Sequence, residues 1–182
     1  MKPAVFLDRD GVINANLERN GRPVAPTTLA EFRLLPGVED AVRQFKERGF
    51  LVIVITNQPD VADGRTARST VEAMHDLIRS KLAVDDIRVC FHNDAAGCAC
   101  RKPKPGMIFD AAAEHGINLA ASSLVGDRWR DVAAGRAAGC VTFFIDYGYK
   151  QEGPNLPDWV VKSLPEAAAL ILGSDLSSAR TK

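Results

Sequence analysis

The 182-residue sequence has no surplus of charge of either sign and few aromatic side chains. Lysine plus arginine and aspartate plus glutamate both number 23, and aromatic residues make up 7%. Proteins that bind nucleic acid usually present basic surfaces with stacking aromatics, so we expect no nucleic-acid partner. No apolar run approaches the roughly 20 residues of a membrane span, and the first residues lack the pattern of a secretory signal. We therefore expect a monomeric cytoplasmic protein with no membrane association.

Cysteine is also scarce, but it is unevenly placed. Three of the four cysteines, Cys90, Cys98 and Cys100, lie within eleven residues. Such clustering in an intracellular chain indicates a metal site rather than disulfides. Cys140 stands apart, and we interpret it as a small buried side chain.

Apolar runs alternate with helical patterns along the chain. This alternation predicts an α/β fold, with a mostly parallel sheet of five or six strands between two layers of helices. The run Leu51–Ile55 is rich in β-branched residues, as in a strand covered on both faces. The expected strands are residues 4–7, 51–55, 87–91, 123–125, 141–145 and an edge strand at 158–161, and the expected helices are residues 38–49, 66–82, 106–115, 129–138 and 164–172.

We expect one domain over residues 1–173, followed by a flexible tail at 174–182 that is small and polar. Two insertions break the alternation, a turn-rich connection from Asn14 to Pro36 and a segment from His92 to Lys104. Neither has the roughly 50 residues of an independent domain, so we expect no large cap domain. His75 and His115 lie in helical patterns without a partner motif, and we expect both at the surface.

Two carboxylates, Asp8 and Asp10, directly follow the first expected strand. At this spacing they can converge on one site, where one is suited to attack phosphorus and the other to protonate a leaving oxygen. Because such a pair repels itself, we expect a cation beside it, and Mg²⁺ is the usual choice. An Asp-x-Asp sequence alone is equally compatible with a solvated turn.

Polar residues also follow later strands. Thr56 comes at the end of the second strand, and its hydroxyl could hold phosphate oxygens. Asp127 follows the fourth strand and is placed to complete a Mg²⁺ site, while Asp131 is either a supporting carboxylate or a charge favoured by a helix N-terminus. Lys102 lies in a proline-stiffened loop from which it could reach a phosphoryl group. Taken singly, each is also compatible with a solvated polar loop.

The order of these motifs is more specific than any one of them. Asp8-x-Asp10, Thr56, Lys102 and Gly-Asp127-x-x-x-Asp131 resemble, in sequence order, the four motifs of the haloacid dehalogenase (HAD) superfamily of aspartate-nucleophile phosphatases. The resemblance covers Phe6 to about Asp146 and implies a Rossmann-like fold. It implies that Asp8 is the nucleophile and a magnesium ligand, that Asp10 is the general acid and base and offers its backbone carbonyl to the metal, that Thr56 and Lys102 hold the phosphoryl group, and that Asp127 binds Mg²⁺.

The cysteine cluster has the pattern of a closed metal site. Cys90, His92, Cys98 and Cys100 form C-x-H-x5-C-x-C, and four such ligands suit a tetrahedral, structural Zn²⁺. The site would order the loop that leads into Arg101 and Lys102. Cysteines without a ligand in a flexible loop are the alternative.

Within the superfamily, this loop followed by Arg101-Lys102-Pro103-Lys104-Pro105-Gly106-Met107 resembles the heptose 1,7-bisphosphate phosphatases, which remove the 7-phosphate. The substrate implied is a small phosphorylated metabolite. The histidinol-phosphate phosphatases share the motifs and the five-residue spacing, so they and enzymes for other sugar phosphates remain alternatives. A phosphotransferase and a non-catalytic zinc-stabilised binding domain are two further hypotheses. The resemblance implies these substrate contacts: Arg9, Asn57, Gln58, Arg101 and Arg128.

Overall fold

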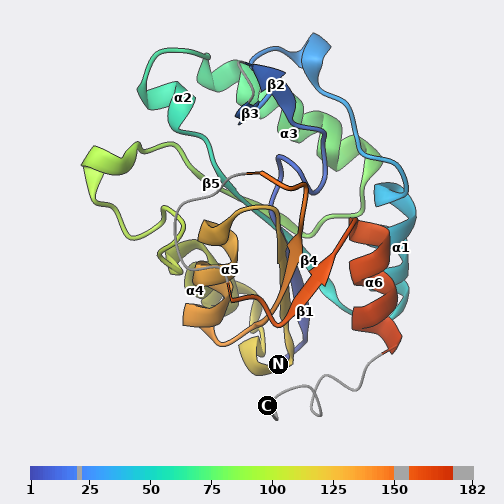
Figure 1. Cartoon of the computed structure of the whole chain (residues 1–182). Helices are drawn as coiled ribbons and strands as arrows, with labels where there is room; N and C mark the ends of the chain where they lie inside the picture. The colour runs from blue at the N-terminus through green and yellow to red at the C-terminus, as the bar shows by residue number, and fades with distance from the viewer. Residues whose placement is uncertain (20–21, 150–155, 174–182) are drawn as a thin grey trace.

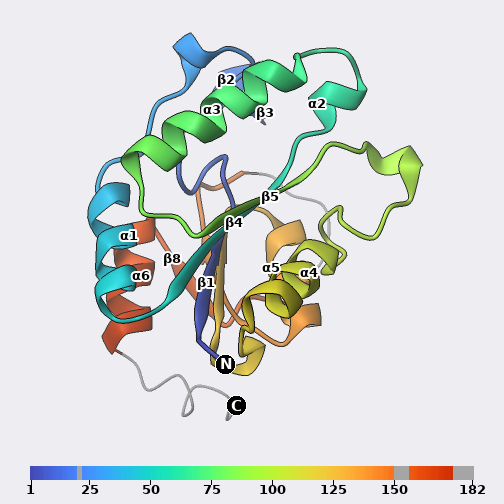
Figure 2. The same ribbon diagram turned by 180° about the vertical axis from the view of Figure 1, so that it is seen from behind.

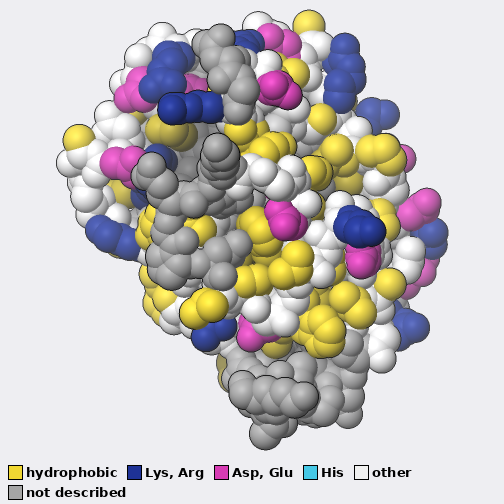
Figure 3. Space-filling model, in the orientation of Figure 1, with side chains coloured by type: hydrophobic (Ala, Val, Ile, Leu, Met, Phe, Trp, Pro, Cys, Tyr) yellow, Lys and Arg dark blue, Asp and Glu magenta, His cyan; other side chains and the backbone are white. Residues whose placement is uncertain are grey.

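A central sheet lies between two layers of helices in the computed structural model, which describes residues 1–19, 22–149 and 156–173 (Figure 1). The expected tail at 174–182 lies outside these residues. Within the described ranges, no helix combines the length and the apolar character needed to cross a bilayer. On the face seen in Figure 3, basic and acidic side chains are interspersed over the described surface.

The main sheet has six parallel strands in the order β5-β4-β1-β6-β7-β8. This confirms the predicted parallel sheet, with the expected edge strand in place. The elements are β1 (Ala4–Leu7), β2 (Leu17–Arg19), β3 (Arg22–Val24), η1 (Leu29–Glu31), α1 (Val38–Glu47), β4 (Leu51–Asn57), α2 (Pro59–Ala62), α3 (Arg68–Lys81), β5 (Asp86–Cys90), η2 (Asp94–Ala96), α4 (Gly106–His115), η3 (Leu119–Ala121), β6 (Ser123–Gly126), α5 (Trp129–Ala138), β7 (Val141–Ile145), β8 (Trp159–Val161) and α6 (Leu164–Gly173).

Side chains of the central strands are buried on both faces. Phe6 and Ile53 belong to one apolar cluster, while Val5 and Val52 belong to the other. Alternate residues of a strand point to opposite faces, which explains why a continuous apolar run suits these positions. Helices α1 and α6 cover one face and α4 and α5 the other, as the two opposite views show (Figures 1 and 2).

Helices begin and end close to the predicted residues. The buried face of α1 includes Val38, Val42 and Phe45, at the spacing of one helical face. Gly116 and Gly139 follow α4 and α5 with φ of 63° and 80°, a left-handed conformation that glycine adopts without strain. These stops fix where the chain leaves each helix and returns to the sheet.

Two expectations need correction. The connection from residue 14 to 36 contains a short antiparallel hairpin, β2–β3, which was expected only as turns. His75 was expected at the surface, but it is fully buried on α3. A helical pattern identifies an apolar face, but a single polar residue on that face gives no signal of its own, because only the tertiary structure supplies its partner.

The order of the strands places a crevice beside β1. After β1 the chain forms β4 and β5 on one side, and then returns to form β6 on the other side. In open parallel sheets ligands bind at such a reversal, outside the carboxyl ends of the strands. The hairpin β2–β3 and helix α3 lie beyond this end of the sheet (Figure 1).

Candidate active site

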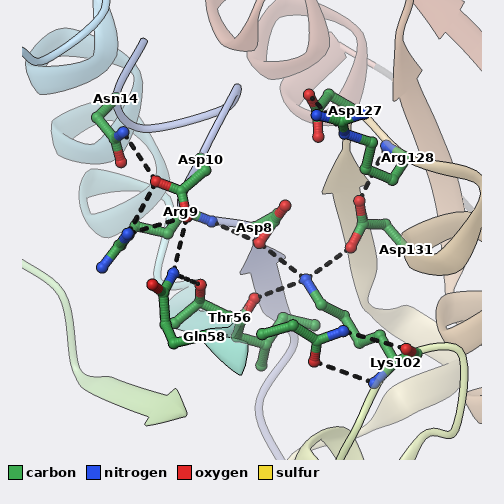
Figure 4. A network of polar contacts seen from close by, with 12 residues as sticks. Asp8, Arg9, Asp10, Asn14, Thr56, Gln58, Lys102, Asp127, Arg128 and Asp131 are labelled. Atoms are coloured by element: carbon green, nitrogen blue, oxygen red, sulfur yellow. Dashed lines mark hydrogen bonds and ion pairs between the residues drawn. The ribbon is translucent and has the colours of Figure 1, made fainter. Parts of the chain in front are cut away.

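Asp8 lies in this crevice, directly after β1. Its backbone N–H donates to the carbonyl of Val125 on β6 over 3.0 Å. Lys102 Nζ donates to Asp8 Oδ1 at 2.8 Å and to the Ile55 carbonyl at 2.9 Å, and it lies 2.6 Å from Asp131 Oδ1 (Figure 4). Lys102 is therefore a buried cation between two carboxylates, and the loop between β5 and α4 brings it there.

Asn57, at the end of β4, holds the backbone of that lysine. Its Nδ2 donates to the Lys102 carbonyl, and its Oδ1 accepts from the Lys102 N–H, both at 3.1 Å. The residue was expected as a substrate contact, and it is among the residues that line the cavity. The structure adds this second contact, which fixes the lysine loop against the strand end.

The Asp10 carboxylate accepts hydrogen bonds from the N–H groups of several side chains. Arg9 Nη2 donates to both carboxylate oxygens at 2.9 Å, Asn14 Nδ2 donates to Oδ1 at 3.0 Å, and Gln58 Nε2 donates to Oδ2 at 2.8 Å (Figure 4). Gln58 also donates to the Thr56 hydroxyl at 2.9 Å. Arg9 and Gln58 were expected to contact substrate, but they are 0% and 2% exposed and are not among the residues that line the cavity. The structure therefore gives them contacts to Asp10 instead.

Three buried carboxylates meet at the crevice and repel one another. Burial and the charge of Asp131 raise the pKa of Asp8 to about 7, although Lys102 opposes the shift. Burial and the charges of Asp8 and Asp131 raise the pKa of Asp127 well above its usual value. Burial alone would lower the pKa of Lys102, but Asp131 and Asp8 raise it. The site thus holds more negative charge than one lysine balances.

These carboxylates fit a divalent cation. Oxygens of Asp8, Asp127 and Asp131 lie within 4.8 Å of one another. Hard oxygen ligands are those that Mg²⁺ prefers, and a cation would relieve the repulsion that raises both pKa values. The carboxylate of Asp10 is engaged by its donors, so only its backbone carbonyl would contribute to such a site.

A cavity of about 160 Å³ opens above Asp8. Arg128, an expected substrate contact, lines it. Asn16 and Arg130 also line it and were not predicted. Asn16 lies outside the motifs, and Arg130 occupies an unspecified position of the fourth motif. Asn16 Nδ2 donates to Asp127 Oδ2 at 2.9 Å. The cavity is lined by Asp8, Asp10, Asn16, Ala25, Asn57, Lys102, Asp127, Arg128, Arg130 and Asp131.

The four residues of the cysteine cluster converge as the spacing predicts. The three sulfurs of Cys90, Cys98 and Cys100 are 3.2–3.6 Å apart, and His92 Nδ1 lies 3.6 Å from Cys90 Sγ and 3.4 Å from Cys100 Sγ. A tetrahedron with Zn–S bonds of about 2.3 Å has edges of about 3.8 Å. The separations are close to those edges and far longer than a disulfide bond, so the cluster could hold Zn²⁺.

The loop that carries this cluster is joined to the crevice through Asp94. Arg101 Nε donates to Asp94 Oδ1 at 2.7 Å, and its Nη1 donates to the His92 carbonyl at 3.1 Å. Arg130 Nη1 donates to the same Asp94 oxygen at 2.8 Å. Arg101 was expected to contact substrate; its guanidinium lies in this network and is not among the residues that line the cavity.

Comparisons with known proteins agree with this fold and site. Residues 99–167 match the HAD-hydrolase-like family. A D-glycero-beta-D-manno-heptose-1,7-bisphosphate 7-phosphatase from Rhodopseudomonas palustris is 37% identical over 91% of this chain and 92% of its own length. The protein of the same name from Escherichia coli K12 is 35% identical over 90% of this chain and 91% of its own length.

A solved structure gives the same result. The D,D-heptose 1,7-bisphosphate phosphatase of B. bronchiseptica, complexed with magnesium and phosphate, superposes with a TM-score of 0.79 at 31% identity and covers 95% of this chain and 99% of that chain. With relatives this similar over nine tenths of its length, the chain belongs to the HAD-like phosphatases. The resemblance inferred from the four motifs is thereby confirmed, as is the predicted fold.

Proposed function

We propose that this chain removes the 7-phosphate of D-glycero-D-manno-heptose 1,7-bisphosphate, with Asp8 as the nucleophile. The observation that carries the mechanism is the contact of Lys102 Nζ with Asp8 Oδ1, 2.8 Å long, in a cavity that also contains Asp10 and Asp127. The relatives named as heptose bisphosphate phosphatases support the substrate, since their similarity extends over most of both chains.

In the first step, an Asp8 carboxylate oxygen attacks the phosphorus. A new O–P bond forms on Asp8, the bond from phosphorus to the sugar O7 breaks, and Asp10 donates its proton to that departing oxygen. Lys102 lines the cavity and faces the charge that spreads over the phosphoryl oxygens. The motif assigns Thr56 to the same phosphoryl group; its hydroxyl is buried and accepts from Gln58 Nε2 at 2.9 Å. The products are an aspartyl phosphate and the sugar with a free hydroxyl.

In the second step, water attacks the phosphorus of the aspartyl phosphate. The Asp10 carboxylate takes a proton from that water, and the bond between phosphorus and the Asp8 oxygen breaks. Inorganic phosphate leaves, while Asp8 is restored as a carboxylate and Asp10 as an acid. The same residue thus supplies the proton and later recovers it, which closes the cycle.

Mg²⁺ and Zn²⁺ would serve different roles in this enzyme. Asp8, Asp127 and the Asp10 carbonyl would hold Mg²⁺, with Asp131 close by and paired to Lys102. When bound, Mg²⁺ supplies positive charge that neutralises the phosphoryl group beside the nucleophile. The four residues of the cysteine cluster would hold Zn²⁺ and leave no open position, so that metal would order the loop that carries Lys102.

The substrate is tested by comparing kcat/KM across a panel with Mg²⁺ present. The panel contains both anomers of the heptose bisphosphate, histidinol phosphate and common hexose phosphates. We expect the highest value for a heptose bisphosphate, and the beta anomer named for the relatives is the first to test. Histidinol phosphate is the second candidate, since the short metal loop also resembles that group. A higher kcat/KM for it, or for a hexose phosphate, would overturn the proposed substrate but not the mechanism.

A further inference from the structure

Arg9, between the two aspartates of the first motif, has a fully buried guanidinium. A buried charge is costly unless it is paired. Its Nε donates to Asp10 Oδ1 at 3.1 Å, and its Nη2 donates to both Asp10 oxygens at 2.9 Å, which fixes the plane of that carboxylate (Figure 4). Arginine suits such two-oxygen pairing better than lysine because its donors form a rigid fork.

The remaining nitrogen of this fork contacts a histidine. Arg9 Nη1 lies 3.3 Å from His75 Nε2, and His75 is fully buried on α3. A guanidinium only donates, so His75 Nε2 accepts and the ring proton is on Nδ1. That Nδ1 lies 3.5 Å from Glu72 Oε2. Burial and the charge of Arg9 lower the pKa of His75 to about 4, so the ring is neutral at neutral pH, as an acceptor must be.

We propose that His75 is a positioning residue, which acts through Arg9 to hold the carboxylate of Asp10 in the orientation needed for proton transfer to the leaving group. This inference rests on the proposed role of Asp10 as general acid. Without the acceptor on α3, a buried N–H of Arg9 would lose its partner. The guanidinium would turn to find another one, and Asp10 would lose the fork that fixes its plane.

Leaving-group dependence tests this role. Asp10 must protonate an alkyl oxygen, but the p-nitrophenolate ion leaves without a proton. We expect His75→Leu to lower kcat/KM for the heptose bisphosphate about tenfold, which is a fraction of what a general acid contributes. For p-nitrophenyl phosphate we expect kcat/KM to fall by less than about twofold. His75→Gln places an amide oxygen near the position of Nε2, and we expect it to restore most of the lost activity.

His115→Leu serves as a matched control, because His115 lies on α4 and pairs with Asp86 away from the crevice. It should change neither substrate's kcat/KM. The inference would be overturned if His75→Leu lost kcat/KM equally on both substrates, or lost none. It would also be overturned if His75→Gln were no more active than His75→Leu. An Asp10→Asn protein with normal turnover would instead overturn the proposed general acid itself.

A second measurement needs neither activity nor a stable variant. Nitrogen NMR of the wild-type histidines distinguishes the two neutral tautomers. We expect His75 to carry its proton on Nδ1 at neutral pH. A proton on Nε2 would contradict the inference, because that nitrogen could not accept from Arg9. This result would stand even if the substrate panel identified a different phosphate ester.

Discussion

At the scale of single residues, Lys102 balances two buried carboxylates. It is 3% exposed and contacts Asp8 at 2.8 Å and Asp131 at 2.6 Å. Such a cation is placed to stabilise charge that develops on a phosphoryl group, and its removal leaves buried negative charge unpaired. Both activity and stability should therefore depend on it.

We predict that Lys102→Met lowers kcat by about two to three orders of magnitude and the free energy of unfolding by roughly 3 kcal/mol. Steady-state kinetics and urea unfolding measure the two effects. Lys104→Met is the control, since the Lys104 ammonium is exposed and donates to the Gly97 carbonyl. If both variants behaved alike, the role assigned to Lys102 would be wrong.

His75 makes stability depend on pH. Its pKa is about 4 in the folded protein, below the usual 6.5. Between these two values the unfolded chain binds a proton at this histidine more readily than the folded protein does. The contribution of His75 to the free energy of unfolding is therefore present above pH 6.5 and is lost as the pH falls to about 4. Compared with His75→Gln, the wild type should lose up to about 1.4 kcal/mol more per pH unit in that window. Urea unfolding at several pH values measures this difference. The same pH dependence of the free energy of unfolding in the wild type and in His75→Gln would contradict the prediction.

Side-chain direction was the part of the site that the sequence predicted least well. The motifs placed Asp8, Asp10, Thr56 and Asp127 at strand ends, where the structure has them. They did not show that Arg9 points into the interior. A strand end brings residues to one edge of a sheet, but the burial of each side chain depends on elements far along the chain, such as α3.

At the scale of elements, the segment between β5 and α4 connects the cysteine cluster with Lys102. Asp94 of η2 binds both Arg101 and Arg130, and these bonds hold the pKa of its carboxyl well below the usual range. The loop is therefore attached to α5 as well as to the metal ligands. A change that disorders this loop should therefore also displace Lys102.

We predict that Cys98→Ser lowers the bound zinc from about one ion per chain, lowers Tm by roughly 5 °C, and reduces phosphatase activity. Metal analysis, thermal unfolding and kinetics measure these effects. Cys140→Ala is the control, because Cys140 is buried outside the cluster. Freshly purified wild-type protein without zinc would contradict the prediction.

Strand β6 and helix α5 approach closely at Gly126. A Cβ on this residue would overlap the Cβ of Asp131 and would lie 2.6 Å from its Oδ2. We predict that Gly126→Ala lowers the free energy of unfolding by about 1–3 kcal/mol and reduces activity, because Asp127 and Asp131 flank the displaced backbone. Gly173→Ala, where a Cβ would meet no atom within 4 Å, should leave both unchanged. If the two variants had the same midpoint of urea unfolding, the prediction that Asp131 leaves no room for a Cβ at Gly126 would be wrong.

Regular elements were predicted well, and the connections were not. Periodicity and glycine stops located α4 and α5 to the residue, since both signals are local. The hairpin β2–β3 was missed because its strands are three residues each, one containing Pro23, and carry no alternating apolar pattern. Its position beside the crevice depends on long-range contacts, including the bond from Arg128 to the Pro23 carbonyl at 3.4 Å.

At the scale of the whole molecule, the fold brings three carboxylates together from two distant parts of the chain, Asp8 from one and Asp127 and Asp131 from the other. Burial and repulsion raise the pKa of Asp8 to about 7 and that of Asp127 as well. Protons and a divalent cation should therefore compete for the crevice. We predict that Mg²⁺ raises Tm by a few degrees, and that its affinity increases as pH rises through about 7, where Asp8 loses its proton.

Thermal unfolding with and without Mg²⁺ across that pH range measures this effect. Asp127→Asn should abolish the increase in Tm. Asp110→Asn, a change at an exposed carboxylate on α4, should retain it. An increase that did not depend on pH, or that survived in Asp127→Asn, would place the Mg²⁺ site elsewhere on the molecule.

The central claim is that Asp8 carries the phosphoryl group during turnover. The most direct measurement is a rapid acid quench of the enzyme with its phosphate ester, followed by mass mapping of the peptides. We expect a phosphate on the peptide that contains Asp8, bound as an acyl phosphate that hydroxylamine removes. We expect no such phosphate in a folded Asp8→Asn protein, which should have lost turnover. Normal turnover by Asp8→Asn, or an acyl phosphate on another residue, would contradict it.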